Sequence, residues 1–507
     1  MTAAQKLHPL SVPYRIIQTA PSIILLVVFA GFAFGQFDPL FVVPLATLVI
    51  FAAIALVVGW QVAYYKRFEY ELTRDTFDIR SGVISRRNRE IPYRRIQNVD
   101  ISRSLIQRAI GLAELRIETA GGGQSEAHLR YVGYDTAKHL QNEIRELTRG
   151  TPTDVKEADR QTATGRPLYE ITDKDLGVLA IASLDLRVAS LLVVILSFTA
   201  PSIIIDLLFA APIDPLVIIA AIIIVVLVGS AILSGASAII NNYGFILTQI
   251  GDELRYERGL LQRYDGSIPL DKVQTLIVTE NVLMRQLRYA SLTLETAGYA
   301  PGQGGGESAR AVPISKFDNT LDIAHKIEEF GDPSFTKPAS QARIRYIWQY
   351  TLLLGVVAII AFAVTWWFDI DVRWWVVLFL APLIPVAGHL KWIHRGYAIS
   401  DRYVLMRSGF WRRRTHIVPF YRIQTVDGVQ SILQRRWGIA TVVVDTAGSS
   451  GLISGDPTAY DLPTDVANEL QDELSVQLQE RLLARKRRDR MREIARPRTY
   501  QGPRGSW

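Results

Sequence analysis

Hydrophobic and polar positions follow two different patterns along this chain. Uniformly apolar blocks occur in pairs, and the members of a pair are separated by short turns such as Gln36–Pro39. The pairs are residues 16–37 with 40–65, 188–211 with 216–240, and 347–368 with 374–390. About 20 helical residues cross a hydrocarbon core, and a helix satisfies its own backbone groups in a bilayer. The pattern therefore predicts six spans in three helical hairpins.

Between the apolar blocks, the period of the pattern becomes two residues, as in Phe68–Thr73, which is typical of half-buried strands. One short stretch occurs three times, as Ile91–Val99, Ile268–Leu276 and Val418–Val426. A glycine lies ten residues before the proline of each copy, at Gly82, Gly259 and Gly409. An acid-Thr-Ala-Gly ending also follows each copy at a fixed distance. Three copies in one register indicate one small fold used three times.

Each copy contains the signals of a complete small domain. The repeated glycines stand where a hairpin turn needs a positive φ. A short helix is expected after the N-cap residues Ser104, Asn281 and Ser431. A longer helix closes each copy, at about residues 135–148, 319–330 and 463–488. Strands followed by one amphipathic helix predict a small barrel or curled sheet capped by that helix.

The expected fold is therefore that of an α+β membrane protein in which each transmembrane hairpin precedes one β domain. The hairpins are placed at residues 1–66, 172–242 and 343–395, and the domains at 67–150, 243–331 and 396–480. Polar stretches at 151–171 and 332–342 are interpreted as linkers, and 481–507 as a basic tail.

Composition agrees with a membrane location. The chain is 49% hydrophobic and carries a formal net charge of +7. Basic residues such as Lys66, Arg67, Arg343 and Arg345 flank the hairpins on the side of the domains, whereas the short turns are acidic. By the positive-inside rule, both termini and all three domains are expected in the cytoplasm of a multi-pass plasma-membrane protein.

The repeated residues resemble a known family. Gly82 through Val99 matches the Gly…Ile-Pro…Arg-Ile-Gln-Asn-Val pattern of bacterial and archaeal pleckstrin-homology-like (PH-like) membrane proteins of the YdbS/YdbT type. Gly409 through Val426 matches it closely, and the middle copy departs from it at Asp271 and Arg288. The resemblance covers nearly the whole chain and implies a seven-stranded barrel capped by a C-terminal helix. It brings no assigned reaction and no catalytic residues.

Two repeat positions are basic in all copies and form the candidate binding surface. They are Arg95, Lys272 and Arg422 at one position, and Arg108, Arg285 and Arg435 at the other. Beside a membrane, each could contribute about 1 kcal/mol of attraction to anionic headgroups. The alternative interpretation is that they belong to solvated faces of a strand and a helix. The repeated glutamines Gln97, Gln274 and Gln424 are expected to be buried amides.

No residue pattern predicts catalysis, a cofactor or a metal site. The chain has no cysteine, and of its seven histidines only His389 and His394 are close together. The leading hypothesis is a non-enzymatic scaffold whose domains dock a protein partner, a second copy or anionic lipid, in envelope maintenance or stress. The alternative is a transporter or export component with regulatory domains. Nucleic acid is the weaker partner for the basic tail, because no aromatic residues alternate with its charges.

Overall fold

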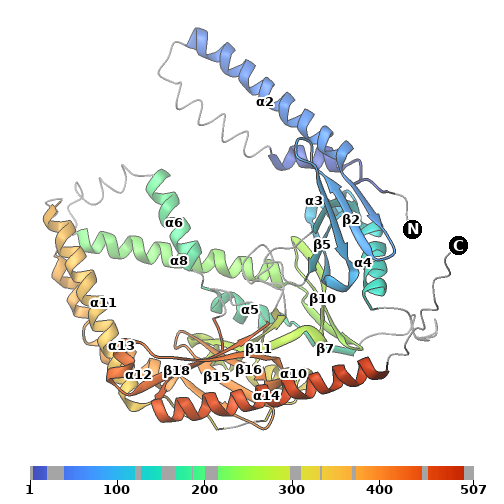
Figure 1. Cartoon of the computed structure of the whole chain (residues 1–507). Coiled ribbons are helices and arrows are strands. Elements are labelled where there is room, and N and C mark those ends of the chain that lie inside the picture. Colours follow the sequence, from blue (N-terminus) through green and yellow to red (C-terminus); the bar gives the residue numbers. More distant parts are fainter. Residues whose placement is uncertain are drawn as a thin grey trace. The chain divides into compact units, whose positions relative to one another are not determined.

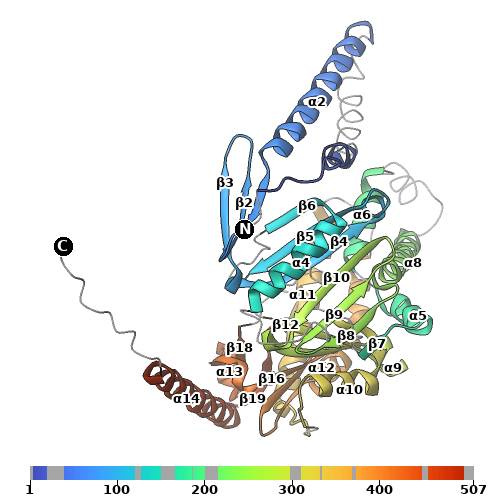
Figure 2. The same ribbon diagram turned by 90° about the vertical axis from the view of Figure 1, so that its right-hand side faces the viewer.

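The computed structural model describes most of the chain, apart from both ends and several internal segments. The described residues are 4–19, 39–119, 127–149, 166–184, 186–199, 215–296, 310–331, 334–367, 373–447 and 455–495. They form two compact units, drawn in Figures 1 and 2. Unit 1 comprises Met1–Leu176 with Ser237–Lys272, and unit 2 comprises Gly177–Ala236 with Val273–Trp507.

Unit 1 contains two antiparallel sheets. The first has the order β1-β2-β3, with β1 at Glu69–Leu72, β2 at Thr76–Ser81 and β3 at Arg87–Pro92. The second has the order β6-β5-β4-β10-β9-β8-β7. Its strands are β4 (Ile96–Ser104), β5 (Leu112–Thr119), β6 (Ala127–Gly133), β7 (Arg166–Glu170), β8 (Ile246–Ile250), β9 (Glu253–Arg258) and β10 (Gln262–Pro269). Helix α4 (Tyr134–Arg149) lies along this sheet (Figure 2).

Unit 2 repeats the plan. Its larger sheet has the order β13-β12-β11-β16-β15-β14, and its smaller sheet the order β17-β18-β19. The strands are β11 (Val273–Asn281), β12 (Tyr289–Thr296), β13 (Arg310–Lys316), β14 (Gly396–Ile399), β15 (Tyr403–Ser408), β16 (Arg412–Pro419), β17 (Ile423–Val429), β18 (Ile439–Thr446) and β19 (Thr458–Pro463). Helix α10 (Phe317–Ile327) contacts β12 and β13, and α14 (Thr464–Ala495) contacts β17 and β18.

The two large sheets are shared between successive copies of the repeat. The second sheet of copy one (β4–β6) continues into the first sheet of copy two (β8–β10), and β11–β13 of copy two continues into β14–β16 of copy three. Within the described residues, the seven-stranded barrel implied by the resemblance is therefore not formed: each outer copy has one separate three-stranded sheet and contributes three further strands to a shared sheet. The edge strand of one copy pairs with a strand of the next copy, and so it does not close a barrel within its own copy. Strand β7 extends this arrangement with residues that the sequence assigned to a linker.

The predicted turns and caps are confirmed. Gly82, Gly259 and Gly409 have φ values of 109°, 103° and 88°. The side chains of Ser104, Asn281 and Ser431 accept hydrogen bonds from the backbone N–H groups three residues later, and so cap the short helices. These helices are α3 (Leu105–Ala109), α9 (Val282–Leu287) and α13 (Ile432–Arg436).

Fewer spans are supported than the six predicted. Among the described residues, Val217–Asn242 and Ser340–Trp367 are long and apolar enough to cross a membrane, and a third span exists only if a bent pair counts as one. The corresponding helices are α8 (Pro215–Asn242) and α11 (Ser340–Trp367). Helix α2 (Pro39–Arg67) and α6 (Leu186–Thr199) belong to the other predicted spans. The predicted spans at 16–37 and 188–211 fall in large part on residues 20–38 and 200–214, which lie outside the described residues.

The predicted span at 374–390 is not one straight helix. A 3₁₀ helix at Trp374–Leu380 and α12 at Leu383–Ile393 meet at an angle of 42°. Pro382 lies at this break, and proline lacks the N–H that a continuous helix requires. A Cβ added at Gly388 of α12 would lie 2.6 Å from Ile347 Cγ1 of α11, so glycine allows these two helices to approach closely.

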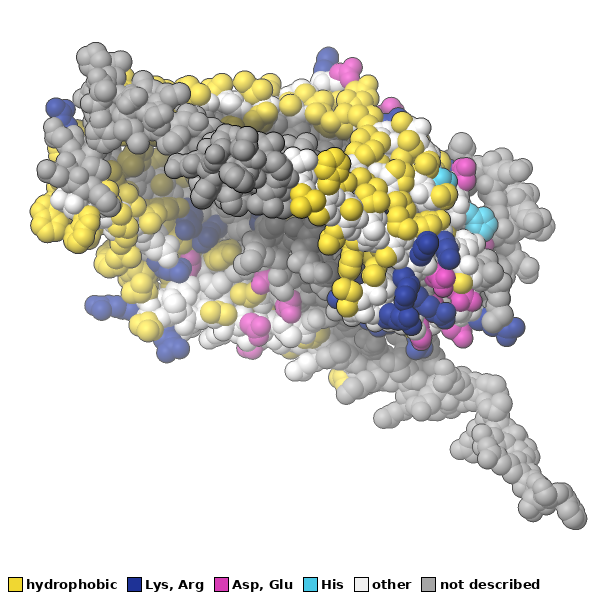
Figure 3. Space-filling view, turned by 90° about the horizontal axis from the view of Figure 1, so that it is seen from above, with side chains coloured by type: hydrophobic (Ala, Val, Ile, Leu, Met, Phe, Trp, Pro, Cys, Tyr) yellow, Lys and Arg dark blue, Asp and Glu magenta, His cyan; other side chains and the backbone are white. Residues whose placement is uncertain are grey.

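Hydrophobic side chains are buried in the sheets and exposed on the long helices. The sheets enclose buried cores, with Phe77, Leu115 and Ile144 in the first copy and Val442 in the third all fully buried. The helices instead expose apolar side chains, including Ile359 of α11, which is 68% exposed. Figure 3 shows broad areas of hydrophobic side chains on one face. Such areas require an apolar environment.

Candidate functional site

The two junctions between copies, here called the seams, are built in the same way. At the first seam β10 runs antiparallel to β4, with Gln262 opposite Ser104. Arg108 Nη1, from α3, donates a hydrogen bond of 3.2 Å to the carbonyl of Leu260 in the turn before β10. The backbone N–H of Leu260 donates at 2.8 Å to the carbonyl of Ile240 in α8. The seam turn is thereby fixed to the end of a membrane helix.

The second seam repeats this geometry one copy later. Strand β16 runs antiparallel to β11, with Arg412 opposite Asn281. Arg285 Nη2 donates a 2.7 Å hydrogen bond to the carbonyl of Phe410, which occupies the position of Leu260 in the repeat. The Phe410 ring also lies 5.3 Å from the ring of His394, at the end of α12. Both seams therefore combine a repeat arginine, a glycine turn and the end of a membrane helix.

The seam turns expose large apolar side chains. Leu260 and Leu261 are 42% and 44% exposed, and Trp411 is 77% exposed. Leu105 and Ile106 of α3, the helix that carries Arg108, are each about half exposed. Apolar and aromatic residues beside arginine are typical of the membrane–water interface. The turns therefore combine exposed apolar groups with an arginine next to the end of an apolar helix.

Buried charges lie behind the first seam. Asp100 of β4 is 9% exposed. Burial raises the pKa of the Asp100 carboxyl to about 6, opposed by the charges of Arg145 and Arg116 and by a hydrogen bond from Asn98. Burial also raises the pKa of Asp265 in β10, again opposed by Arg145. A Cβ at Gly266 would lie 2.5 Å from Asp100 Oδ1, so only glycine leaves room for this carboxylate.

The second seam has different buried chemistry. Glu280 of β11 accepts hydrogen bonds from Arg413 of β16, at 2.8 Å from Nε and 2.7 Å from Nη2. The Glu280 and Arg413 side chains are only 6% and 22% exposed. His416, opposite Ile277, is 2% exposed. Burial, with a smaller contribution from Arg414, lowers the pKa of His416 to about 3, so its imidazole is neutral at physiological pH.

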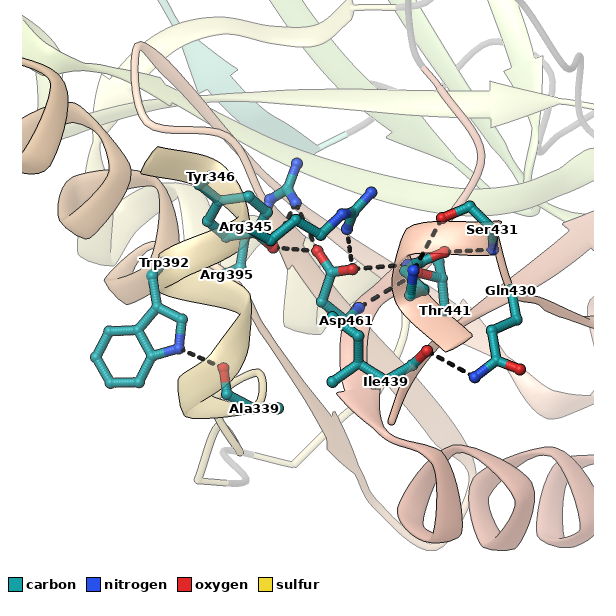
Figure 4. Close-up of polar contacts among 11 residues, drawn as sticks. Ala339, Arg345, Tyr346, Trp392, Arg395, Gln430, Ser431, Ile439, Thr441 and Asp461 are labelled. Atoms are coloured by element: carbon teal, nitrogen blue, oxygen red, sulfur yellow. Dashed lines mark hydrogen bonds and ion pairs between the residues drawn. The ribbon is translucent and has the colours of Figure 1, made fainter. Parts of the chain in front are cut away.

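A third polar cluster surrounds Asp461 at the base of the third hairpin (Figure 4). Asp461 is fully buried and adopts a left-handed backbone conformation with φ 54°. Its carboxylate accepts hydrogen bonds from Arg345 and Tyr346 of α11 and a 2.7 Å bond from Gln434 Nε2 of α13. Arg395 Nη1 lies 3.6 Å from Asp461 Oδ2. One carboxylate thus connects a membrane helix, α13 and the last strand of the module.

The first copy makes the same connection with different residues. Tyr131, equivalent to Asp461, also has a left-handed backbone, with φ 72°. Its ring lies 5.3 Å from Tyr14, and its hydroxyl donates a 2.5 Å hydrogen bond to Gln18 Oε1. The Tyr131 carbonyl accepts from His8 N, just as the Asp461 carbonyl accepts from Ala339 N. In both copies, the segment before a hairpin is therefore docked on the module that follows that hairpin.

The structure separates the six candidate basic residues into two groups. Arg108 and Arg285 bind the seam turns, and Arg435 is exposed at the same position of α13, beyond the last seam. The other three lie in the short 3₁₀ turns between the two sheets of a copy. There Lys272 Nζ is 3.2 Å from Asp271, and the Arg422 guanidinium is 4.8 Å from the Tyr421 ring. Arg95 is exposed.

Sequence reasoning missed the seams and the Asp461 cluster. Pairing between copies leaves no local pattern, because either edge of a strand has the same alternation. Gln274, in β11 at a seam, is buried as expected, whereas its equivalent Gln424 in β17 is exposed. The residue equivalent to Asp461 is uncharged in the other copies, for example Tyr131 in the first. A charge at this position in only one copy was the available sign of the cluster. Among the described residues, no three metal-ligating side chains gather as a metal would require.

Comparison with known proteins agrees with this architecture. The bacterial PH domain matches three times, at residues 23–148, 181–327 and 349–478, and each match includes most of a hairpin and the module after it. The chain is also similar to the UPF0699 transmembrane protein YdbT of Bacillus subtilis (strain 168), with 24% identity over 481 residues, covering 89% of this chain and 94% of that protein. This is therefore a membrane protein with three repeats, and it belongs to the bacterial PH domain family.

Proposed function

We propose that the protein is a non-enzymatic membrane scaffold that holds three PH-like modules against the cytoplasmic face, as docking surfaces for anionic lipid or protein. The observation that carries this proposal is the composition of the two seam turns. Each places exposed apolar residues, Leu260 with Leu261 or Trp411, beside a repeat arginine and the end of a membrane helix. Apolar insertion and cationic attraction act together at an anionic bilayer surface.

The six candidate basic residues would supply the electrostatic part. Arg108 and Arg285 use one N–H group for a backbone carbonyl, and a guanidinium has five. Arg95, Lys272 and Arg422 extend the positive surface along the modules. Each contributes about 1 kcal/mol when close to anionic headgroups. The six-span topology, with both termini in the cytoplasm, belongs to this proposal.

Transport is the weaker alternative. Helix α8 contains no charged residue, and the charges of α11, Arg343 and Arg345, lie near its first turn. A path for a polar substrate would place ionisable groups within the spans. Nothing in these two helices supports such a path.

Fluorescence of a single introduced cysteine tests the lipid contact, since the chain has none of its own. Trp411→Cys in the full-length protein is labelled with the polarity-sensitive dye NBD and reconstituted in nanodiscs. The matched control is Asp401→Cys, at the turn on the opposite end of β15. We expect blue-shifted, brighter emission at 411 only, increased by phosphatidylglycerol and reduced by salt. Equal, water-like emission at both sites would overturn the proposal.

The same two variants test orientation. A membrane-impermeant maleimide should label neither cysteine in intact cells and should label Asp401→Cys after permeabilisation. Labelling of intact cells would place the modules outside and contradict the cytoplasmic assignment.

A further inference from the structure

Both seams use the same two strands of the repeat. Strands β3, β10 and β16 are equivalent, because each begins a few residues after the repeated glycine. Strands β4, β11 and β17 are equivalent, because each ends at the N-cap of the short helix or two residues before it. The register is also the same: Gln262 faces Ser104, and Arg412 faces Asn281. One pairing rule therefore joins copy one to copy two, and copy two to copy three.

The rule leaves one strand unused at each end of the series. Strand β3 of the first copy is the edge of the β1-β2-β3 sheet, and β17 of the third copy is the edge of the β17-β18-β19 sheet. On their outer sides neither pairs with another described strand. Arg87–Glu90 of β3 are all exposed, as are Asp427–Val429 of β17. In β11, which lies in a seam, every residue is buried or half-buried.

Applying the seam register to these two edges gives a complementary pair. It places Ser85 opposite Ser431, Arg87 opposite Val429, and Arg89 opposite Asp427. The β3 side is basic, with Arg86, Arg87 and Arg89 exposed. The β17 side offers an acid, since Asp427 is exposed in this strand. Opposite charges directly across a strand pair are stabilising, and like charges are destabilising.

The third copy and the first copy also supply the two residues that an equivalent arginine contact would need. Arg108 binds the Leu260 carbonyl, and Arg285 binds the Phe410 carbonyl. By the same spacing, Arg435 of the third copy would bind the carbonyl of Val83, in the turn before β3. Charged edges commonly block pairing with unrelated strands. An edge of arginines therefore admits a partner that offers an acid in register.

We propose that β17 of one molecule pairs with β3 of a second copy of this chain, as a third seam formed between molecules. The pairing is antiparallel, with Arg89 opposite Asp427 and Arg435 on the Val83 carbonyl. A contact between two different surfaces is heterologous, so it produces a closed ring or an open row of molecules in the membrane. The proposal does not depend on lipid binding, and the two are tested by separate readouts.

Disulfide cross-linking tests the register, with the natural absence of cysteine as background. Full-length chains with different tags are co-expressed, one with Arg87→Cys or Glu90→Cys and the other with Val429→Cys or Val426→Cys. The register predicts disulfides for 87 with 429 and for 90 with 426. Directly opposed Cα atoms lie about 4.5–5.5 Å apart, within the range of a disulfide. The same variants recombined as 87 with 426 and 90 with 429 are the matched controls.

Mixed-tag dimers from at least one matched pair, with none from the recombined pairs, would support the third seam. Equal yields from matched and recombined pairs would overturn it, as would cross-links only to a different protein. A chain with both Arg87→Cys and Val429→Cys should give covalent oligomers. If it gives only monomers with an internal disulfide, the pairing lies within one molecule and the proposal is wrong.

A charge exchange tests the energetics independently. Arg89→Glu or Asp427→Arg alone should weaken self-association roughly tenfold, measured by mass photometry in nanodiscs, because each places like charges in opposition. The double exchange should restore it. Arg74→Glu, in the β1–β2 turn of the same sheet, makes the same change of charge away from the edge and should have no effect. Failure of the double variant to recover would contradict the predicted pair.

Discussion

The Glu280–Arg413 pair gives the sharpest test of how the second seam is held. Burial and then the charge of Arg413 lower the pKa of Arg407 to about 10, and the same two causes lower the pKa of Arg285. Glu280 opposes both shifts, so among the described residues this acid acts on Arg407 and Arg285 as well as on its partner Arg413. Glu280→Leu leaves three cations without a counter-charge. Arg413→Leu leaves Glu280 with Arg285 and Arg407 nearby.

The two substitutions should therefore differ in cost. Removing one partner of a buried pair costs about 3–5 kcal/mol when the other is left uncompensated, and this is expected for Glu280→Leu. Arg413→Leu loses charge-assisted hydrogen bonds, worth about 1.5–3 kcal/mol. At about 1.4 kcal/mol for each factor of ten, these values predict roughly 10²–10⁴-fold and 10–10²-fold faster local opening.

Hydrogen exchange followed by mass spectrometry measures this opening in the intact protein, on peptides that cover β11 and β16. Arg263→Leu is the matched control, because Arg263 and Glu257 form a 2.9 Å ion pair whose side chains are about half exposed. Exposed pairs contribute about 0–1 kcal/mol, so exchange should barely change. If Arg413→Leu opens the seam as much as or more than Glu280→Leu, the three-arginine reasoning is refuted.

Three further predictions follow from the buried polar groups. Because the folded pKa of Asp100 is raised to about 6, its ionised form costs stability as pH rises from about 4 to 6; Asp100→Asn should raise Tm relative to the native protein at pH 7.5, raise it less at pH 5, and leave it unchanged below about pH 4. Because the folded pKa of His416 is lowered to about 3, stability is lost as pH falls below the ordinary value of 6.5; His416→Phe should gain Tm relative to the native protein between pH 7.5 and pH 5. Asp461→Leu should destabilise the third module by about 3–5 kcal/mol, and Asp461→Asn by less, since the asparagine Oδ1 can still accept from Arg345 and Gln434 and asparagine tolerates positive φ; limited proteolysis would rank them.

The local elements of the repeat could be predicted from sequence because their causes are local. The positive φ of Gly82, the cap formed by Ser104 and the closing helix of each copy depend on neighbouring residues, and all are confirmed. The membrane helices were predicted from apolar length alone, and that signal does not show that Pro382 bends the last one. The position of that proline was the available clue.

The candidate site was predicted only in part, because its geometry is long-range. The repeat spacing made Arg108 and Arg285 candidate binding residues, but it could not give their hydrogen-bond partners, Leu260 and Phe410, which lie 152 and 125 residues away in the chain. The choice between closing a barrel and pairing with the next copy depends on two strand edges of similar character. The residues of either strand alone therefore do not predict which of the two pairings forms.

The shared sheets also affect how such proteins can change in length during evolution. One hairpin and its module contribute one strand of each seam type, so an extra copy inserted between two others finds both neighbours ready to pair. The outermost strands remain the same whatever the number of copies. Duplication or loss of a whole copy is therefore structurally neutral at the ends, whereas a break within a copy would strip two strands of their partners at once.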